Sequence, residues 1–206
     1  MSQETTQVLA KFAAELQYDA IPERTREYCK DVLLDTLACA VAGHQGDETH
    51  QIAALASGLA QSNEASVIGG DRLSLAGATM LNGYLITAVT MCDAHRPTLT
   101  HITPEVVPPA LAIAERDGLS GRDLLVALAA GSEAMTRIGV GSDYPAFRAR
   151  GWHGPGVFGP FGAAAAVGRL RRRFARDTRA AIASASGLPL LSRLTAAPLR
   201  EFSARA

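Results

Sequence analysis

The sequence predicts an all-α protein, a multi-helix bundle packed around an interior of small side chains. Apolar residues recur every three or four positions through most of the 206 residues, which is the period of an amphipathic helix. Residues that start and stop helices bracket these stretches. The one segment with an extended character, residues 65–73, is short and is bounded by an asparagine and two glycines. We therefore expect at most a brief strand there.

Three helices are predicted in the first part of the chain. The second begins after Pro22, which a first helical turn tolerates, and ends with Gly43 as a C′ residue. A third covers about residues 48–61. The first spans residues 5–17 and has apolar side chains at helical spacing: Val8, Leu9, Phe12 and Leu16.

The next two predicted helices have polar residues at their starts. Ser74 can cap a helix that continues to Met91 and is apolar on nearly every face, as in a buried central helix. Thr103 followed by Pro104 is typical of an N-cap and a first helical residue, and this helix should stop at Gly118.

Three more helices complete the predicted bundle. Ser120 and Asp123 form a capping-box pattern that opens a helix to about Gly139. Residues 156–170 are rich in glycine and alanine, which lets helices approach closely in a crowded interior. A last helix covers residues 175–187.

Charge is unevenly distributed along the chain. The net charge is zero, but nine arginines face only two acidic residues from 167 to 206. We interpret this as a solvated basic face or a docking face for an acidic partner. No aromatic residues alternate with the arginines as a base-stacking platform requires, so no nucleic acid is expected as a partner. We divide the chain into a helical domain, 1–187, and a weakly defined basic tail, 188–206.

The sequence also indicates the compartment. No stretch approaches the roughly 20 apolar residues that span a bilayer, and the N-terminus lacks the pattern of an export signal. The three cysteines lack metal-ligand spacing and fit reduced thiols better than disulfides. We therefore expect a cytoplasmic protein without membrane contact.

Two loops concentrate the groups that can do chemistry. An imidazole is the best acid–base group near neutral pH, a carboxylate can orient it, and arginines can hold an anionic substrate bidentately. Arg137 is a further anchor on a predicted helix. The loop residues are Asp93, His95, Arg96 and His101 in the first loop, and Arg148, Arg150 and His153 in the second.

Other sites fit these residues less well. Asp93 and the histidines 95, 101 and 153 could form a two-histidine, one-carboxylate metal centre, but no helical metal motif supports it. GPGVFG at 154–159 satisfies GxGxxG, yet no strand precedes it, so a dinucleotide site is disfavoured. Cys92 is interpreted as a small buried residue rather than a nucleophile. We expect neither a metal nor a cofactor.

The chain resembles the MmgE/PrpD family, whose members include 2-methylcitrate dehydratase, cis-aconitate decarboxylase and iminodisuccinate epimerase. From residue 91 it reads MCDAHRPTLTHITPEVVPPALAIAE, similar to the family's DDxHRxxxxHPxxxVxPAALALAE. RGWHGPGVFGPFGAAAAVGRL resembles its RGFHxTxxxGxFGAAAAAAKL, and LLDTLACAVAG resembles its opening LLDTLGCALAG. These motifs occur in family order between about residues 8 and 187.

The resemblance implies a fold, a chemistry and a site. The fold would be the first part of the family's helical domain, without its α/β lid. The chemistry would be metal-free proton transfer at the carbon α to a carboxylate of a small di- or tricarboxylate. His101 and His153 match histidines that line the family's active site, Asp93 matches the second acid of its DD pair, and His95 matches the histidine of DDxHR.

The chain departs from the family pattern at several positions. Two of three acids are missing before Asp93, and Ile102 replaces the proline after His101. The family's catalytic lysines lie in a later portion, and this chain has no lysine after Lys30. We expect either a lyase-type enzyme or a truncated or split member that needs a partner to supply the lid. A homo-oligomer, or pairing with a complementing second subunit, is expected.

Overall fold

Most of the chain is helical, which confirms the all-α prediction. The computed structural model describes residues 2–171. Within that range the elements are α1 (Ser2–Glu15), the 3-10 turn η1 (Tyr18–Ala20), α2 (Glu23–Gly43), α3 (Thr49–Gly58), β1 (Ala65–Ser66), β2 (Arg72–Leu73), α4 (Leu75–Ala88), α5 (Thr103–Arg116), α6 (Gly121–Gly141), α7 (Tyr144–Ala149) and α8 (Gly154–Leu170).

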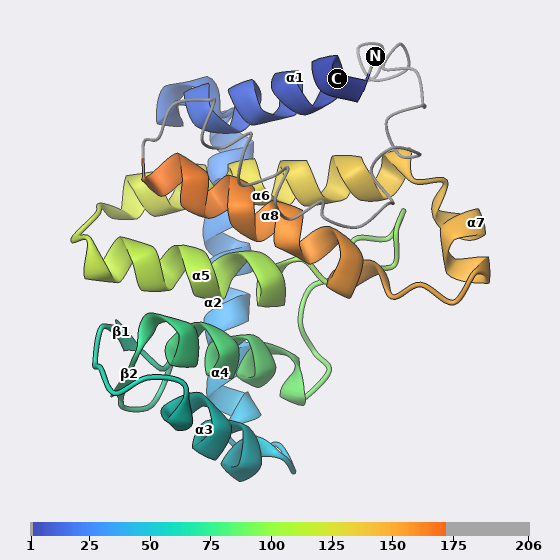
Figure 1. Ribbon diagram of the computed structural model, residues 1–206. Helices are drawn as coiled ribbons and strands as arrows, with labels where there is room; N and C mark the ends of the chain where they lie inside the picture. The colour runs from blue at the N-terminus through green and yellow to red at the C-terminus, as the bar shows by residue number, and fades with distance from the viewer. Residues whose placement is uncertain (1, 172–206) are drawn as a thin grey trace.

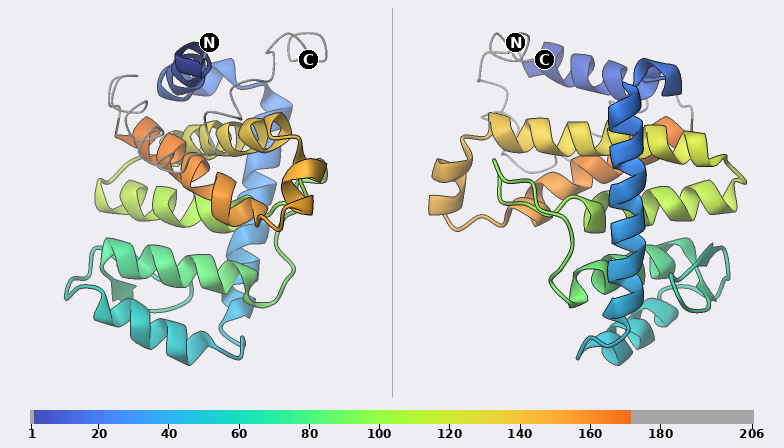
Figure 2. Two further views of the ribbon diagram at one scale, coloured as in Figure 1. Left: turned by 45° about the vertical axis from the view of Figure 1, so that its right-hand side comes forward. Right: turned by 180° about the vertical axis from the view of Figure 1, so that it is seen from behind.

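The helices are stacked, and α2 crosses the stack. Figure 1 shows α1, then α6 with α8, then α5, α4 and α3, one below another, with α2 running behind them. The view from behind in Figure 2 shows α2 lying across the others along most of its length. Helix α8 packs on both α5 and α6.

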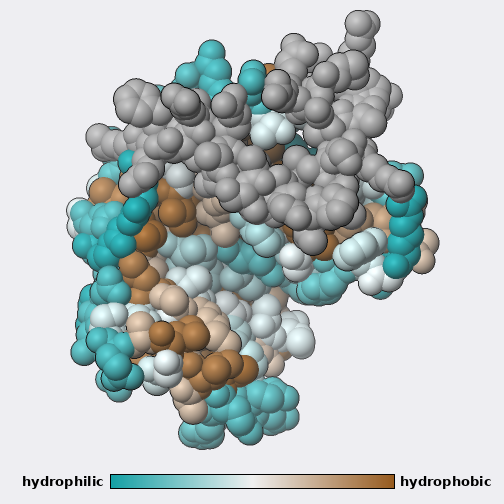
Figure 3. All heavy atoms as spheres, viewed as in Figure 1, coloured by the Kyte–Doolittle hydropathy of each residue, from teal (hydrophilic) through white to brown (hydrophobic). Residues whose placement is uncertain are grey.

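The two largest clusters of buried side chains in the described range lie in the upper and the lower part of the stack. Buried side chains of α5, α6, α7 and α8 form the upper cluster, including Val106, Met135 and Phe158. A second cluster joins α2, α3 and α4 around Leu85 and Ile86, which are fully buried. Figure 3 shows further apolar side chains at the surface where α3 and α4 lie.

The extended segment is the brief strand that the sequence allows. Strands β1 and β2 pair antiparallel, with Ala65 opposite Leu73. The buried side chain of Asn82 on α4 holds this hairpin, because it accepts from the backbone N–H of Ile68 and donates to the carbonyl of Ser66.

Several helix ends follow the predicted signals. Ser74 accepts a hydrogen bond from the N–H of Gly77, and the capping box of Ser120 and Asp123 is present. Gly118 has φ +62°, as a left-handed residue after a helix requires. The helix from Ser74 ends at Ala88 rather than at Met91.

Two predicted caps are wrong. Gly43 is the last residue of α2 rather than a left-handed residue beyond it. A Cβ at this position would lie 2.0 Å from the carbonyl oxygen of Leu85, so glycine permits close packing of α2 on α4. Thr103 is the first residue of α5 and not its N-cap; Ile102 holds that position and offers no side-chain acceptor.

Helix α6 is long and apolar enough to cross a membrane by length and composition alone. No other helix in the described range is as long and as apolar, and 56% of its 18-residue apolar stretch is buried inside the molecule. A core helix of a soluble protein passes the same test, so this is weak evidence for a membrane span. The predicted helix 175–187, the tail 188–206 and most of the basic stretch lie outside the described residues.

Candidate functional site

The loop between α4 and α5 is built as a tight hairpin. His95 and Thr100 pair as an isolated antiparallel bridge, with the N–H of His95 donating to the Thr100 carbonyl at 2.8 Å. Thr98 and Thr100 are buried, and their hydroxyl groups hydrogen-bond to each other. Leu99 between them adopts φ +43°, an uncommon conformation for a branched residue. Buried threonines thus fix the path of the chain toward His101.

Asp93 supplies the cap that α5 lacks locally. Its two carboxylate oxygens accept hydrogen bonds from the N–H groups of Ile102 and Thr103 at 3.0 and 2.9 Å. The hydroxyl of Thr103 donates to the same carboxylate at 2.5 Å. First-turn N–H groups have no partner within the helix, so this carboxylate satisfies them from a distance in sequence. Asp93 therefore positions the segment that carries His101.

The ring of His101 has a defined orientation. Its Nδ1 lies 2.6 Å from the backbone carbonyl oxygen of Asp93. A carbonyl can only accept, so Nδ1 carries the hydrogen and donates it. In the neutral ring Nε2 is then left unprotonated, and it can accept a proton. The half-buried His101 is thus arranged as a proton acceptor.

His153 has the opposite arrangement. It is the N-cap of α8, and its Nδ1 accepts from the N–H of Gly156 at 3.2 Å. Because Nδ1 accepts, the neutral ring carries its hydrogen on Nε2. His153 is exposed to solvent, as are Arg148 and Arg150 before it. Neither arginine forms an ion pair with a described residue.

The structure brings the two histidine-bearing segments together. A Cβ at Gly154 would lie 2.4 Å from Cγ2 of Thr100, so the residue after His153 touches the residue before His101. Both views in Figure 2 show the α4–α5 loop beside α7 and the first turn of α8. Tyr144 of α7 also contacts this position. Glycine at 154 is required for this close approach.

The other predicted site residues are placed differently. His95 Nδ1 lies 2.7 Å from the hydroxyl of Thr98, so its ring is engaged within the hairpin. Burial lowers the pKa of His95, partly opposed by Asp93 and Glu133. Arg137 pairs with Glu133 one turn away on α6 at 2.5 Å, and Arg96 is exposed at the hairpin.

Cys92 lies against His101, with its Sγ 3.4 Å from Nδ1. Burial, followed by the charge of Asp93, raises the pKa of this thiol to about 11, which keeps it protonated near neutral pH. In the described part of the chain, no three His, Cys, Asp or Glu side chains are grouped to hold a metal ion. The side chains of His95, His101 and Asp93 instead form hydrogen bonds with separate backbone and hydroxyl groups.

Sequence reasoning missed Glu105. It occupies the first turn of α5, where an acid is ordinarily a solvated complement to the helix dipole. Its Oε2 is buried and is the one buried side-chain polar atom without a hydrogen bond in the described range. Burial raises the pKa of this carboxyl to about 7, opposed by its own backbone N–H and reinforced by Asp93. No local signal in the sequence marks this burial.

GPGVFG lies within α8 and follows α7 and a turn, so no strand precedes these glycines as a dinucleotide fold requires. Helix α7 was also missed by sequence reasoning. Pro145 at its start was the available signal, since proline is common in a first turn.

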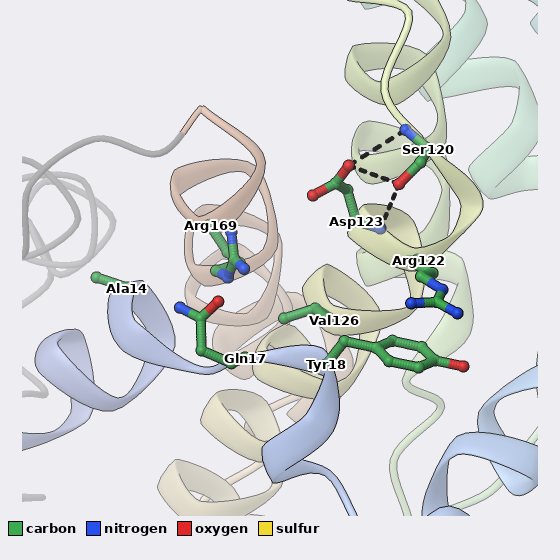
Figure 4. A pocket seen from close by; sticks show the side chains of 8 residues that line it. All are labelled: Ala14, Gln17, Tyr18, Ser120, Arg122, Asp123, Val126 and Arg169. Atoms are coloured by element: carbon green, nitrogen blue, oxygen red, sulfur yellow. Dashed lines mark hydrogen bonds between the residues drawn. The ribbon is translucent and has the colours of Figure 1, made fainter.

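A separate pocket of about 510 Å³ opens near the far end of α8 (Figure 4). Its charged residues already have partners. Asp123 belongs to the capping box, Arg122 stacks over the ring of Tyr18 at 4.9 Å, and Arg169 donates to the carbonyl of Leu16. By helix length it is about 24 Å from His153, and we do not assign it to the same site.

Fold and site together define a helical domain that carries, on adjoining loops, two histidines whose Nδ1 atoms have opposite hydrogen-bonding roles. The sequence matches the MmgE/PrpD N-terminal domain over residues 7–193, and the chain belongs to this family.

Several curated relatives are similar to this chain. A cis-aconitate decarboxylase-like protein, oryM, of Aspergillus oryzae is 32% identical over 86% of this chain and 38% of its own length. Cis-aconitate decarboxylase of Aspergillus terreus is 30% identical over 80% of this chain and 35% of its own length. The human cis-aconitate decarboxylase is 29% identical, with 87% and 39% covered. The chain thus spans less than two fifths of the length of these relatives.

Proposed function

We propose that this chain carries the proton-transferring part of a metal-free, lyase-type enzyme acting on a small di- or tricarboxylate. The observation that supports it most is the opposite hydrogen-bonding role of Nδ1 in the two rings. Nε2 of His101 is free to accept a proton, and Nε2–H of His153 is free to donate one. The names of the similar decarboxylases support a carboxylate substrate.

In a dehydration or an epimerisation His101 removes a proton from the carbon α to a carboxylate. His153 delivers a proton to the leaving hydroxyl group in a dehydration, to the other face of the carbanion in an epimerisation, or to the carbanion that the loss of CO₂ leaves in a decarboxylation. Exposed Arg148, Arg150 and Arg96 bind substrate carboxylates, a task that suits the guanidinium fork. Asp93 holds the start of α5 in place and does not itself react.

Activity assays test this proposal. The purified chain is given 2-methylcitrate and cis-aconitate, and H101A and H153A are each expected to lower kcat/KM by about 10²–10⁴-fold. R148Q and R150Q should mainly raise KM. H50A is the matched control, since His50 is exposed on α3, which does not carry either histidine loop. Activity that survives both loop-histidine changes would contradict the assignment.

We further propose that another polypeptide segment covers His153 during turnover. The exposure of His153, Arg148 and Arg150 supports this, because a water-filled site weakens electrostatic stabilisation. The cover would come from a second copy of the chain or from a complementing subunit that supplies the lid and the missing catalytic groups. If a complementing subunit supplies them, the chain would be inactive alone, and the histidine variants would be compared in the assembled complex. Light scattering, and assays with and without co-expressed neighbouring reading frames, test this; a fully active monomer would refute it.

A further inference from the structure

Glu105 lies at the contact between the two helices that carry the histidine loops. It lies in the first turn of α5, four residues after His101, and its side chain lies over Gly159 of α8. A Cβ at Gly159 would lie 2.4 Å from Cγ of Glu105 and 3.5 Å from Cδ. Glycine therefore leaves a slot that the glutamate side chain fills.

This slot suits a neutral acid and not a carboxylate. Oε2 is buried and accepts no hydrogen bond from any described residue. Burial makes the charged carboxylate costly, a hydrogen bond from its own backbone N–H offsets this only in part, and the carboxylate of Asp93 adds repulsion. The raised pKa of about 7 agrees with this geometry.

In the described range no cation is among the groups that shift the pKa of Glu105. Arg137 on α6 is paired with Glu133, and His101 donates to a backbone carbonyl. The ionisable groups whose charges interact with that of Glu105 are Asp93 and Cys92, both before α5 and both acids. The carboxyl is thus most stable with its proton in place.

We propose that Glu105 is a positioning residue that, as the neutral acid, holds the His153 end of α8 against the His101 loop and loosens this contact when it loses its proton. The consequence for catalysis rests on the proposed function: proton transfer would decline on the alkaline side because the two rings separate. The protonation state and the contact itself do not depend on that function.

The sign of the pH effect follows from linkage. An unfolded glutamate titrates near ~4.3, so the folded chain binds more protons between there and about 7. The contribution of Glu105 to stability is present in full below the unfolded pKa, and it is lost as the pH rises through the folded pKa. The isosteric variant E105Q cannot lose a proton and keeps its stability through this range.

Denaturation of wild type and E105Q from pH 5 to 8.5 tests the first half of the proposal. We expect the unfolding constant of wild type to rise relative to E105Q by on the order of tens-fold across this range. Parallel curves would overturn the proposal. If E105Q does not fold, carboxyl ¹³C NMR of wild type gives the answer: one glutamate signal should titrate near 7, and its absence would be equally decisive.

Trp152 tests the second half. It is the single tryptophan of the chain, precedes His153, and stacks on Phe147. Quenching of its fluorescence by acrylamide should increase between pH 6 and 8.5 in wild type and stay level in E105Q. Equal quenching in both proteins would refute the positioning role even if the stability curves diverge. Loss of the proposed activity would change neither measurement.

Discussion

The two histidine-bearing segments differ in how firmly they are held. The loop before α5 is fixed by a backbone bridge, two buried threonines, the cap from Asp93 and the ring contact of His101. The turn before α8 has one 3.2 Å cap at His153, and its arginines are exposed. One half of the candidate site is therefore preorganised, and the other half is open to a covering element. Preorganised groups lose little entropy on binding, whereas open ones can close over a substrate.

The largest effect should come from D93A. This change removes acceptors from the N–H groups of Ile102 and Thr103 and should destabilise the chain by about 2–3 kcal/mol. Chemical denaturation measures it. S120A, which removes an exposed cap on α6, is the control and should cost about 1 kcal/mol. Equal losses would show that the α5 loop is no more firmly built than an ordinary helix start.

G154A should break the contact between the two segments. The new Cβ meets Thr100, so either the hairpin or the first turn of α8 must shift, at a cost of about 1–3 kcal/mol. G121A is the matched control because nothing lies within 4 Å of a Cβ there. If both variants have the same denaturation midpoint, the two loops do not pack as described.

Replacing one histidine in each segment should show a smaller difference in stability between the two segments. H95A loses the contact with Thr98 and should cost about 1 kcal/mol, whereas H153A should cost about 0.5 kcal/mol or less. Because burial lowers the pKa of His95, its contribution is present above the unfolded value of ~6.5 and is lost as the pH falls through the folded value. The difference in unfolding free energy between wild type and H95A should therefore be smaller at pH 5 than at pH 8. A gap that widens on acidification would contradict this.

The smallest perturbation is a labelling experiment that changes no residue. The buried, protonated thiol of Cys92 should react with iodoacetamide at least about tenfold more slowly than in unfolded protein. A C92S variant identifies the signal by mass spectrometry. Rapid labelling of Cys92 would show that the α4–α5 loop opens readily and that the contrast between the two segments is false.

Local patterns were sufficient at some helix ends, where neighbouring residues act on each other. The capping box at Ser120 and the turn at Gly118 were predicted because cap and helix are a few positions apart. Asp93 as the cap of α5 was not, since it lies ten residues from Thr103 and acts only after the hairpin has folded. Glu105 escaped for a similar reason: the surface that buries it belongs to α8, far along the chain.

The sequence by itself determined that this chain is helical, where most helices lie, and which histidines and arginines could act together. Periodicity, caps and motif order are local, and they can be recognised in the sequence without knowledge of packing. Only the tertiary structure decided that Asp93 supports α5 and that Oε2 of Glu105 is buried at the α5–α8 contact. These outcomes depend on which atoms exclude water from which others, and that is set by helices distant in sequence meeting in space.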